Sequence, residues 1–293
     1  MGDARTRRAA ATAIVWLAVL SALVLASAAD AMGSPRIAAL QVGLRGKGLY
    51  AATIDGLWGP ATERGVRRLQ RRAGLAVDGI AGPRTRRALG RYGRPNLGRR
   101  LLRVGRVGWD VSQLQFLLAW HGFPSGTFDG AFGQRTRAAV LRFQRFARLG
   151  RDGIVGAGTL AALRHRIPHS PLLVRRPIAA GITDGFGPRG ARFHAGVDFP
   201  AAYGTRVRAA RRGRVVFAGW DRGGFGYLVV VRHGHGVYTW YAHLARVLVR
   251  RGQLVRRASA VGRLGATGYA SGPHLHFEVH VRGAAVNPLS ALR

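Results

Sequence analysis

Five residues near the C-terminal end of this 293-residue chain have the side chains that a hydrolytic metal centre needs. They are His194 and Asp198 in FHAGVDFP, His243 in WYAHL, and His274 and His276 in SGPHLHFEV. A hydrolytic zinc takes three protein ligands, from imidazole nitrogens and carboxylate oxygens, and keeps a further position for water. Cysteine is absent, so thiolate sites are excluded. The residues therefore predict a two-histidine, one-aspartate zinc centre, with two imidazoles left over for proton transfer.

The spacing of these residues indicates how they are held. HLHFEVHV has the β-branched and aromatic content of a strand, in which alternate side chains share a face, so His274 and His276 are expected on one face. Glu278 and His280 continue that face, and the opposite face is apolar and buried: Leu275, Phe277 and Val279. Glycine and proline between and after His194 and Asp198 disfavour a helix, so that pair is expected in a loop that runs into a strand.

The other histidines are not expected to bind the metal. His233 and His235 lie among glycines in VRHGHGV, which is typical of a hairpin turn, and His280 is expected to be an ordinary strand residue. Glu278 has two readings, one as a group that orients a ligand imidazole and one as an exposed strand residue. Solvent-exposed positions in or near connectors are expected for the rest: His121, His165 and His169.

An internal repeat fills the N-terminal half. When the sequence is slid so that Ile54 lies over Phe128, two long segments align without a gap. The matching residues of the first copy are Asp55, Gly56, Gly59, Thr62, Gln70, Asp78, Gly79, Gly82, Thr85 and Leu89. The chain therefore contains two copies of one module.

Each copy has the pattern of three short helices. Leu40, Gln41 and Leu44 recur at helical spacing, and GP dipeptides at Gly59 and Gly82 place proline at a helix start. Asp-Gly pairs such as Asp55-Gly56 and Asp129-Gly130 are expected to form turns rather than calcium sites, because no further carboxylates follow at ligand spacing. Core packing is expected for two aromatic residues, Trp58 and Phe132.

The predicted fold class is α+β multidomain, with two small three-helix bundles followed by an antiparallel β-sheet domain. The strand-rich pattern begins at Ile178, and breaker-rich, charged stretches separate the units. The expected layout is a signal peptide or anchor at 1–31, modules at 34–92 and 107–165, linkers at 93–106 and 166–177, and a β domain that carries the candidate metal site at 178–293.

The N-terminus has the pattern of a secretory signal. Arg5, Arg7 and Arg8 precede an apolar run from Ala9 to Leu25 that ends in small residues. Cleavage between Ala28 and Ala31 is one interpretation, and an uncleaved membrane anchor is the other. Both place the remainder of the chain outside the cytoplasmic membrane.

The formal charge of +35 is carried almost wholly by arginine and is spread along the chain. Even spreading argues against a dedicated nucleic-acid arm, so no specific nucleic-acid partner is expected. Electrostatic retention on an anionic wall polymer and plain solvated positive faces are both compatible with this charge.

The N-terminal repeats resemble small three-helix peptidoglycan-binding domains, on the segments IDGLWGPATERGVRRLQ and VDGIAGPRTRRAL and their copies. From Ile178 to Leu289 the chain resembles the lysostaphin and LytM type of zinc endopeptidase. This resemblance implies that the zinc ligands are His194, Asp198 and His276, and that the catalytic histidines are His243 and His274. Some relatives use a tyrosine near the first ligand to bind the oxyanion, but none stands between Gly185 and His194.

The resemblance implies a secreted, wall-associated zinc metalloendopeptidase that hydrolyses peptide cross-links of bacterial peptidoglycan and is anchored by its two modules. The alternative is a wall-binding scaffold or activator of another hydrolase, whose own site is covered or weakly active. Erosion of the site would favour the alternative, and none of the five groups is missing.

Overall fold

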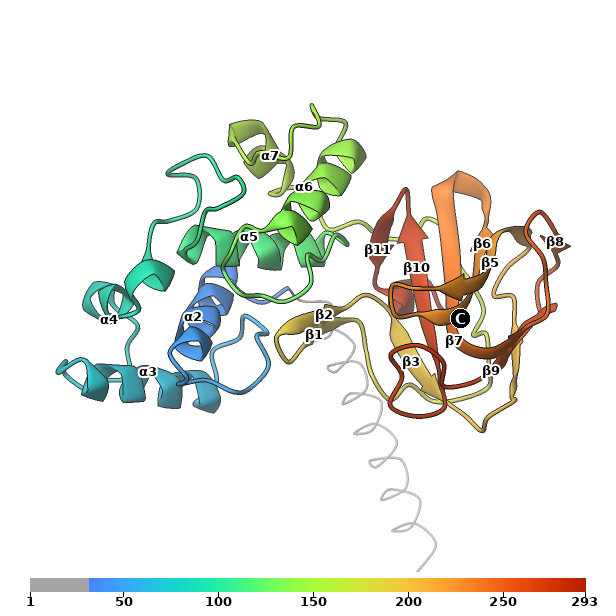
Figure 1. The fold of residues 1–293 in the computed structure, drawn as a ribbon, viewed down its shortest axis with the longest axis horizontal. Helices are drawn as coiled ribbons and strands as arrows, with labels where there is room; N and C mark the ends of the chain where they lie inside the picture. The colour runs from blue at the N-terminus through green and yellow to red at the C-terminus, as the bar shows by residue number, and fades with distance from the viewer. Residues whose placement is uncertain (1–31) are drawn as a thin grey trace, which may run out of the picture. The chain divides into compact units, whose positions relative to one another are not determined.

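The structure, a computed structural model, describes residues 32–293, so the segment expected to be a signal peptide or anchor lies outside the described residues. Residues 33–293 form one compact unit in which helices come first and a large sheet follows (Figure 1). The expected α+β class, with helical modules before an antiparallel sheet, is confirmed. Within residues 32–293, no helix has the length and hydrophobicity needed to span a membrane.

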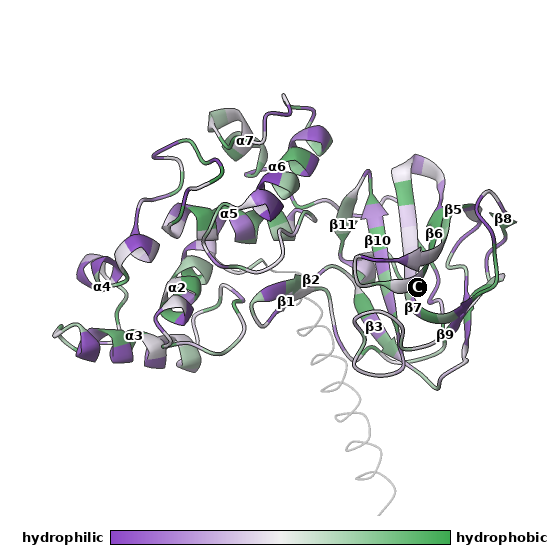
Figure 2. Ribbon diagram, in the orientation of Figure 1, coloured by the Kyte–Doolittle hydropathy of each residue, from purple (hydrophilic) through white to green (hydrophobic). Residues whose placement is uncertain are grey.

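Six α-helices form the two modules. Module 1 contains α2 (Pro35–Gly46), α3 (Pro60–Arg72) and α4 (Pro83–Ala88), followed by the short 3-10 helix η1 (Gly90–Gly93). Module 2 contains α5 (Trp109–Trp120), α6 (Gln134–Phe146) and α7 (Ala157–Ala162). All three helices of module 1 begin at proline, whose fixed φ suits the first helical turn. Hydrophilic and hydrophobic residues alternate along α3 and α6, as expected for helices with one buried face (Figure 2).

A buried glutamine organises each half of each module. The Gln41 amide nitrogen donates to Asp55 Oδ1 at 2.8 Å and to Thr62 Oγ1 at 3.1 Å, and its oxygen accepts from the Gly56 N–H at 2.9 Å. The same three-residue network recurs in Gln70–Asp78–Thr85, Gln115–Asp129–Thr136 and Gln144–Asp152–Thr159. The Asp-Gly pairs are turns, as predicted, but their aspartates also bind these amides. The pattern D-G-x-x-G-x-x-T thus occurs four times in the sequence, twice in each module.

The C-terminal part is built on a nine-stranded antiparallel sheet. Its main path runs in the order β11 (Ala284–Val286), β10 (His274–Val281), β7 (Val237–Val247), β6 (Gly226–Arg232), β5 (Gly213–Asp221) and β8 (Leu254–Val255). Off this path, β3 (Val197–Pro200) pairs with β10, and β9 (Ala260–Leu264) pairs with β7 and with β4 (Arg206–Arg208). A separate hairpin consists of β1 (Gly187–Arg189) and β2 (Arg192–His194). Two 3-10 turns complete the domain, η2 (Gly234–Gly236) and η3 (Pro288–Ser290).

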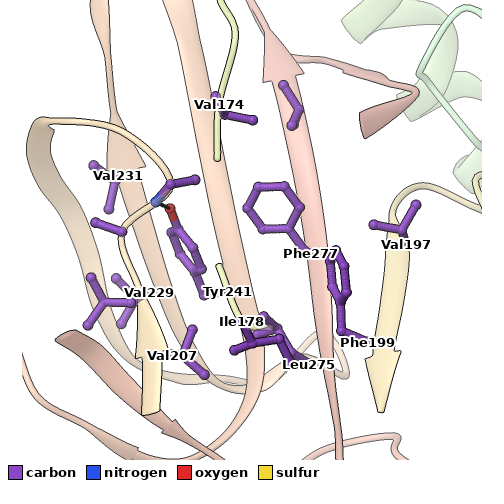
Figure 3. Close-up of a cluster of buried hydrophobic side chains, with 14 of the residues drawn as sticks. Val174, Ile178, Val197, Phe199, Val207, Val229, Val231, Tyr241, Leu275 and Phe277 are labelled. Carbon is purple, nitrogen blue, oxygen red and sulfur yellow. Dashed lines mark hydrogen bonds between the residues drawn. The ribbon is translucent and has the colours of Figure 1, made fainter. Parts of the chain in front are cut away.

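One face of the sheet covers the hydrophobic core. Leu275, Phe277 and Val279 of β10 are fully buried there, which confirms the predicted apolar face of this strand. Figure 3 shows Phe277 beside Tyr241, whose hydroxyl accepts a 2.8 Å hydrogen bond from the Ala210 N–H. Because side chains alternate along a strand, the even-numbered residues of β10 lie on the opposite face, where the candidate site is found.

Both modules contact the sheet domain. Ala284 of β11 belongs to the hydrophobic core of module 2, and the Ala285 N–H donates to the Gly122 carbonyl at 3.1 Å. The tip of the β1–β2 hairpin accepts two hydrogen bonds, from Ile54 N–H to Gly190 and from Phe128 N–H to Ala191, each 2.8 Å long. Ile54 and Phe128 are equivalent in the repeat, so the two modules hold the hairpin through the same position of each copy.

Two predictions about single side chains of the modules were wrong. Phe132 is buried as expected, but its counterpart Trp58 is 46% exposed, because it lies at the surface of a turn rather than behind it. His121, expected in solvent, is 3% exposed and its Nε2 contacts the Leu163 carbonyl at 3.0 Å. That ring packs edge-on against Phe143, so it belongs to the core of module 2.

Candidate metal centre

Three neighbouring strands bring the predicted ligands together. In β10, His276 lies opposite Asp198 of β3 on one side and Ala242 of β7 on the other. His194 is the last residue of β2, and two residues separate it from the start of β3. The loop expected for His194 and Asp198 is therefore only the link between two short strands. Gly196 in that link packs so closely on β10 that a Cβ there would lie 2.5 Å from the Phe277 carbonyl oxygen and 2.9 Å from His276 Cε1.

Three potential ligand atoms converge on one point. His276 Nδ1 lies 2.9 Å from both Asp198 Oδ1 and His194 Nε2, and His194 Nε2 lies 3.2 Å from Asp198 Oδ1. Among residues 32–293 this trio is the group of His, Asp and Glu side chains close enough to share one metal ion. All three side chains are buried, and they are less than 9% exposed.

The outer nitrogens of the two rings are already engaged. His194 Nδ1–H donates to the Gly185 carbonyl at 2.7 Å, and His276 Nε2–H donates to Glu278 Oε1 at 2.9 Å. The tautomers set by these bonds leave lone pairs on His194 Nε2 and His276 Nδ1, which point at Asp198 Oδ1. With both rings in these neutral forms, three acceptors at such short separations repel one another unless a cation lies between them, either a proton in the metal-free protein or a metal ion. The donor set therefore fits a divalent metal ion with nitrogen and oxygen ligands.

The charges around the trio favour an ionised carboxylate. Burial acts to raise the pKa of Asp198, but hydrogen bonds with His194 and His276 outweigh it and hold that pKa well below its usual range. Arg189 donates to Asp198 Oδ2 at 2.7 Å and also pairs with Asp184. Since Arg189 occupies the second oxygen of Asp198, Oδ1 is the atom left to face an ion.

Glu278 and His276 form a strongly coupled buried pair. Burial alone would lower the pKa of His276, but hydrogen bonds with Asp198 and Glu278 raise it to about 9. Burial would raise the pKa of Glu278, but hydrogen bonds from His276 and His280 lower it to about 2. Of the two readings of Glu278, the exposed one was wrong, because the side chain is 4% exposed and orients the His276 ring.

The two other predicted site histidines stand beside the trio. The ring centres of His243 and His274 are 4.8 Å apart, and His243 lies 5.8 Å from His276 by the same measure. His243 Nδ1–H donates to the Thr267 carbonyl at 2.8 Å, and His274 Nδ1–H donates to the Gly272 carbonyl at 2.9 Å. Each ring therefore keeps a free lone pair on Nε2. Burial lowers the pKa of His243 to about 4, so its ring is neutral at pH 7.

A β-bulge aims His243 into the cleft. Between Tyr227↔Leu244 and Val229↔Tyr241, β7 has one residue more than β6. His243 lies in this bulge with a φ of 60°, a left-handed conformation that costs a non-glycine residue about 1–2 kcal/mol. Such strain at a polar residue beside a candidate ion site is a common feature of functional sites.

The five residues line one cleft of about 650 Å³. Its walls also include Asp184, Arg189, Phe225 and Tyr269, and Tyr269 is 85% exposed at the rim. Sequence reasoning missed Arg189, because its neighbours GPRG match no ligand spacing. It also missed the three backbone carbonyls that orient the imidazoles, at Gly185, Thr267 and Gly272, which only the folded chain reveals.

The remaining histidines lie away from the trio. His235 is exposed in the η2 turn with a φ of 55°, as predicted, and His165 and His169 are exposed as well. His233 is buried and bridges the Arg212 carbonyl and the Thr239 hydroxyl. His280 contacts Glu278 and stacks on Trp240 with ring centres 4.8 Å apart. None of these histidines belongs to the trio.

Family models match both parts of the chain. Residues 192–288 match peptidase family M23, and residues 33–89 and 108–163 match the putative peptidoglycan binding domain. The two module matches correspond to the two copies of the repeat, and the peptidase match covers the strands that carry all five site residues.

Several characterised proteins are similar to the C-terminal part. A DD-carboxypeptidase/endopeptidase of Neisseria meningitidis is 44% identical over 99 residues, which are 34% of this chain and 23% of that protein. A peptidoglycan DD-endopeptidase of Vibrio cholerae is 42% identical over 98 residues, or 33% of this chain and 23% of that protein. The chain thus spans less than a quarter of the length of these two relatives. The lysostaphin catalytic domain from Staphylococcus simulans matches 38% of this chain and 90% of its own at 33% identity, with a TM-score of 0.36.

Proposed function

We propose that this protein is a zinc metalloendopeptidase acting on peptide cross-links of bacterial peptidoglycan, because its C-terminal part matches peptidase family M23 and follows two segments that match the peptidoglycan binding domain. The convergence of His194 Nε2, Asp198 Oδ1 and His276 Nδ1 carries the proposal. These atoms are the proposed metal ligands, and they open into a cleft large enough for a peptide.

Zinc held by these ligands would supply a Lewis acid that acidifies a water molecule and polarises a carbonyl. The chain supplies the proton acceptors. His243 and His274 present Nε2 lone pairs on the same side of the cleft, and their rings are fixed through Nδ1 by backbone carbonyls. In this proposal one ring takes a proton at Nε2 from the attacking water, and the proton then passes to the leaving amine.

The depressed pKa of His243 keeps its Nε2 lone pair available. A ring with a pKa of about 4 is neutral across the physiological range, so it can accept a hydrogen bond or a proton at Nε2 without first losing a proton. Arg189 has a positioning role, because it holds Asp198 Oδ2 and thereby fixes the direction of Oδ1. The bulge in β7 positions His243 in the cleft, and the close packing of Gly196 on β10 holds the link between His194 and Asp198 next to His276.

The substrate part of the proposal rests on the modules and on the relatives. Two domains of the peptidoglycan-binding type would hold the chain on the wall, and the similar Vibrio cholerae protein is a peptidoglycan DD-endopeptidase. The proposal also includes secretion and association with the wall, which the apolar segment from Ala9 to Leu25 supports. It further includes electrostatic retention on anionic wall polymers, which the charge of +35 supports.

The test uses the full chain and purified cell walls. Metal-loaded protein should release soluble peptide-linked fragments, a chelator should abolish the release, and added zinc should restore it. Mass spectrometry of the fragments would identify the bond that is cleaved. Walls that stay intact with metal-loaded protein, while a soluble peptide is also left uncleaved, would refute the proposal.

The scaffold alternative gains no support from the site. In the described part of the chain, the residues that line the metal cleft all come from the sheet domain, so neither module covers it. The five side chains are present and oriented. Comparing the full chain with a segment that starts at Pro177 would measure any inhibition by the modules directly.

A further inference from the structure

A second cavity lies on the same face of the sheet as the metal cleft. It has a volume of about 750 Å³, and its floor includes His280 of β10, Trp240 and Tyr238 of β7, and Val230 of β6. In the strand register, His276 pairs with Ala242, Glu278 with Trp240 and His280 with Tyr238, so these pairs share the face of the metal ligand. The Phe225 side chain, which lines the metal cleft, lies between the two hollows, with its ring centre 5.3 Å from Trp240 and 5.8 Å from His276.

Module 2 provides the opposite wall of this cavity. Arg142, Arg145 and Phe146 come from α6, and Arg148 follows its end. The contacts between Gly122 and Ala285, and the burial of Ala284 in the core of module 2, hold α6 beside the sheet. The module therefore contributes side chains to a cavity on the same face of the sheet as the metal centre.

The charge of this wall is strongly one-sided. Four arginines line the cavity, at 142, 145, 148 and 282, against a single carboxylate, Asp221. Asp221 Oδ1 already accepts from the Gly223 N–H. Within the described residues, the side chains of Arg145 and Arg148 form no hydrogen bond or ion pair, so their donors remain available to a ligand. A guanidinium binds a carboxylate through two parallel hydrogen bonds, and the aromatic floor suits the apolar parts of a peptide.

We propose that this cavity is a substrate subsite, formed jointly by the sheet and module 2, that binds a free carboxylate of an acidic peptide several residues from the bond to be cleaved. His276 and His280 are four residues apart in β10, and at about 3.3 Å per residue this places the subsite roughly 13 Å from the metal ligands. An extended peptide in the cleft advances by a similar step, so the carboxylate lies about four residues from the cleaved bond. The proposal rests on the proposed peptidase function and adds a specificity determinant to it.

Binding is measured on the full chain after metal removal, so that no hydrolysis occurs. The probes are two peptides of one sequence, one with a free carboxylate four residues from the cleavage position and one with that group amidated. We expect the amidated peptide to bind at least about fivefold more weakly. The Arg145→Gln, Arg148→Gln double variant should bind both peptides equally, at the weaker level, because the charge-assisted pairs are lost.

Arg135→Gln is the matched control. It removes an exposed arginine from the same helix, α6, but that side chain does not line the cavity. The control should keep the full preference for the free carboxylate. A preference that survives in the double variant, or falls equally in the control, would mean that only the general positive charge of the protein is sensed and would overturn the subsite.

Two further outcomes separate the alternatives. If inorganic phosphate or a phosphodiester polymer binds at the arginines while neither peptide binds, the cavity recognises another anion and the proposal is wrong. If the acidic peptide binds with the expected preference but the metal-loaded protein cleaves no peptide, the subsite stands and the proposed peptidase function fails.

Discussion

Buried polar networks occur in two regions of this molecule, and they differ in what they leave unsatisfied. In the modules, each glutamine amide satisfies an aspartate, a threonine and backbone groups, and the network is closed. At the metal centre, outward hydrogen bonds saturate the far side of each ring and direct lone pairs inward. The first arrangement stabilises a fold, because every buried group has a partner. The second is incomplete without a cation, and such incompleteness marks a functional site.

The strongest test of this difference between the module networks and the metal centre is to remove one of the three proposed ligand atoms. We expect Asp198→Ala and His276→Ala to lose both bound metal and peptide hydrolysis, since two ligands hold zinc far more weakly than three. Metal content is measured beside activity. Zinc should raise the Tm of the wild-type protein and leave that of both variants unchanged, because only the wild type binds the ion in its native state. A variant that retains one zinc per chain would contradict the ligand assignment.

His243→Ala separates proton transfer from metal binding. This ring lies outside the trio, so the variant should keep its zinc while hydrolysis falls by about 10²–10⁴-fold. Metal analysis and turnover of a soluble peptide are measured on the same sample. His235→Ala, which changes an exposed histidine in a turn, serves as the control and should leave both quantities unchanged. Loss of zinc from the His243 variant would show that the ring is a ligand.

The pH dependence of metal affinity follows from His276. In the metal-free protein its pKa is raised to about 9, from an ordinary value of about 6.5. The bound proton therefore stabilises the metal-free fold fully below pH 6.5, and this stabilisation is lost as the pH rises through 9. Zinc must displace that proton, so we expect its affinity to rise about tenfold per pH unit between pH 6.5 and 9. Competition with a chromophoric chelator measures the slope, and an affinity that is flat over this range would show that no proton is displaced.

The sequence predicted the parts of the site that depend on local geometry. Alternation in HLHFEVHV placed His274 and His276 on one face, and both contact Asp198 in the fold. It could not give the register between β3 and β10, which sets Asp198 opposite His276, because the two strands are far apart in the chain. Nor could it give the bulge at His243 or the pairing of Arg189 with Asp198, since both depend on which strands become neighbours.

The modules show a different kind of omission. The sequence reveals the repeat and its helices, but the Asp-Gly pairs predict only turns and the spacing of Leu40, Gln41 and Leu44 predicts only a helix. A glutamine precedes the aspartate by 14 residues in the first half of each module and by 8 residues in the second half, so this signal is present in the sequence. Core packing is expected from the sequence for both Trp58 and Phe132, but only Phe132 is buried, at 1% exposed against 46% for Trp58.

Removing a module glutamine should lower the stability of the protein and leave peptide hydrolysis unchanged, whereas removing a proposed metal ligand should abolish hydrolysis. Gln115→Leu leaves the Asp129 carboxylate and the buried Gly130 N–H without their partner, which costs about 1–3 kcal/mol of unfolding free energy. Hydrolysis of a soluble peptide per folded molecule should be unchanged, because the network does not reach the cleft. Gln113→Leu is the matched control, since Gln113 lies on the same helix, is similarly buried and makes a single contact of 3.5 Å, to the Trp109 carbonyl. If Gln115→Leu lowers turnover as strongly as it lowers stability, the module network takes part in the chemistry, and the distinction between closed and open polar networks fails for this protein.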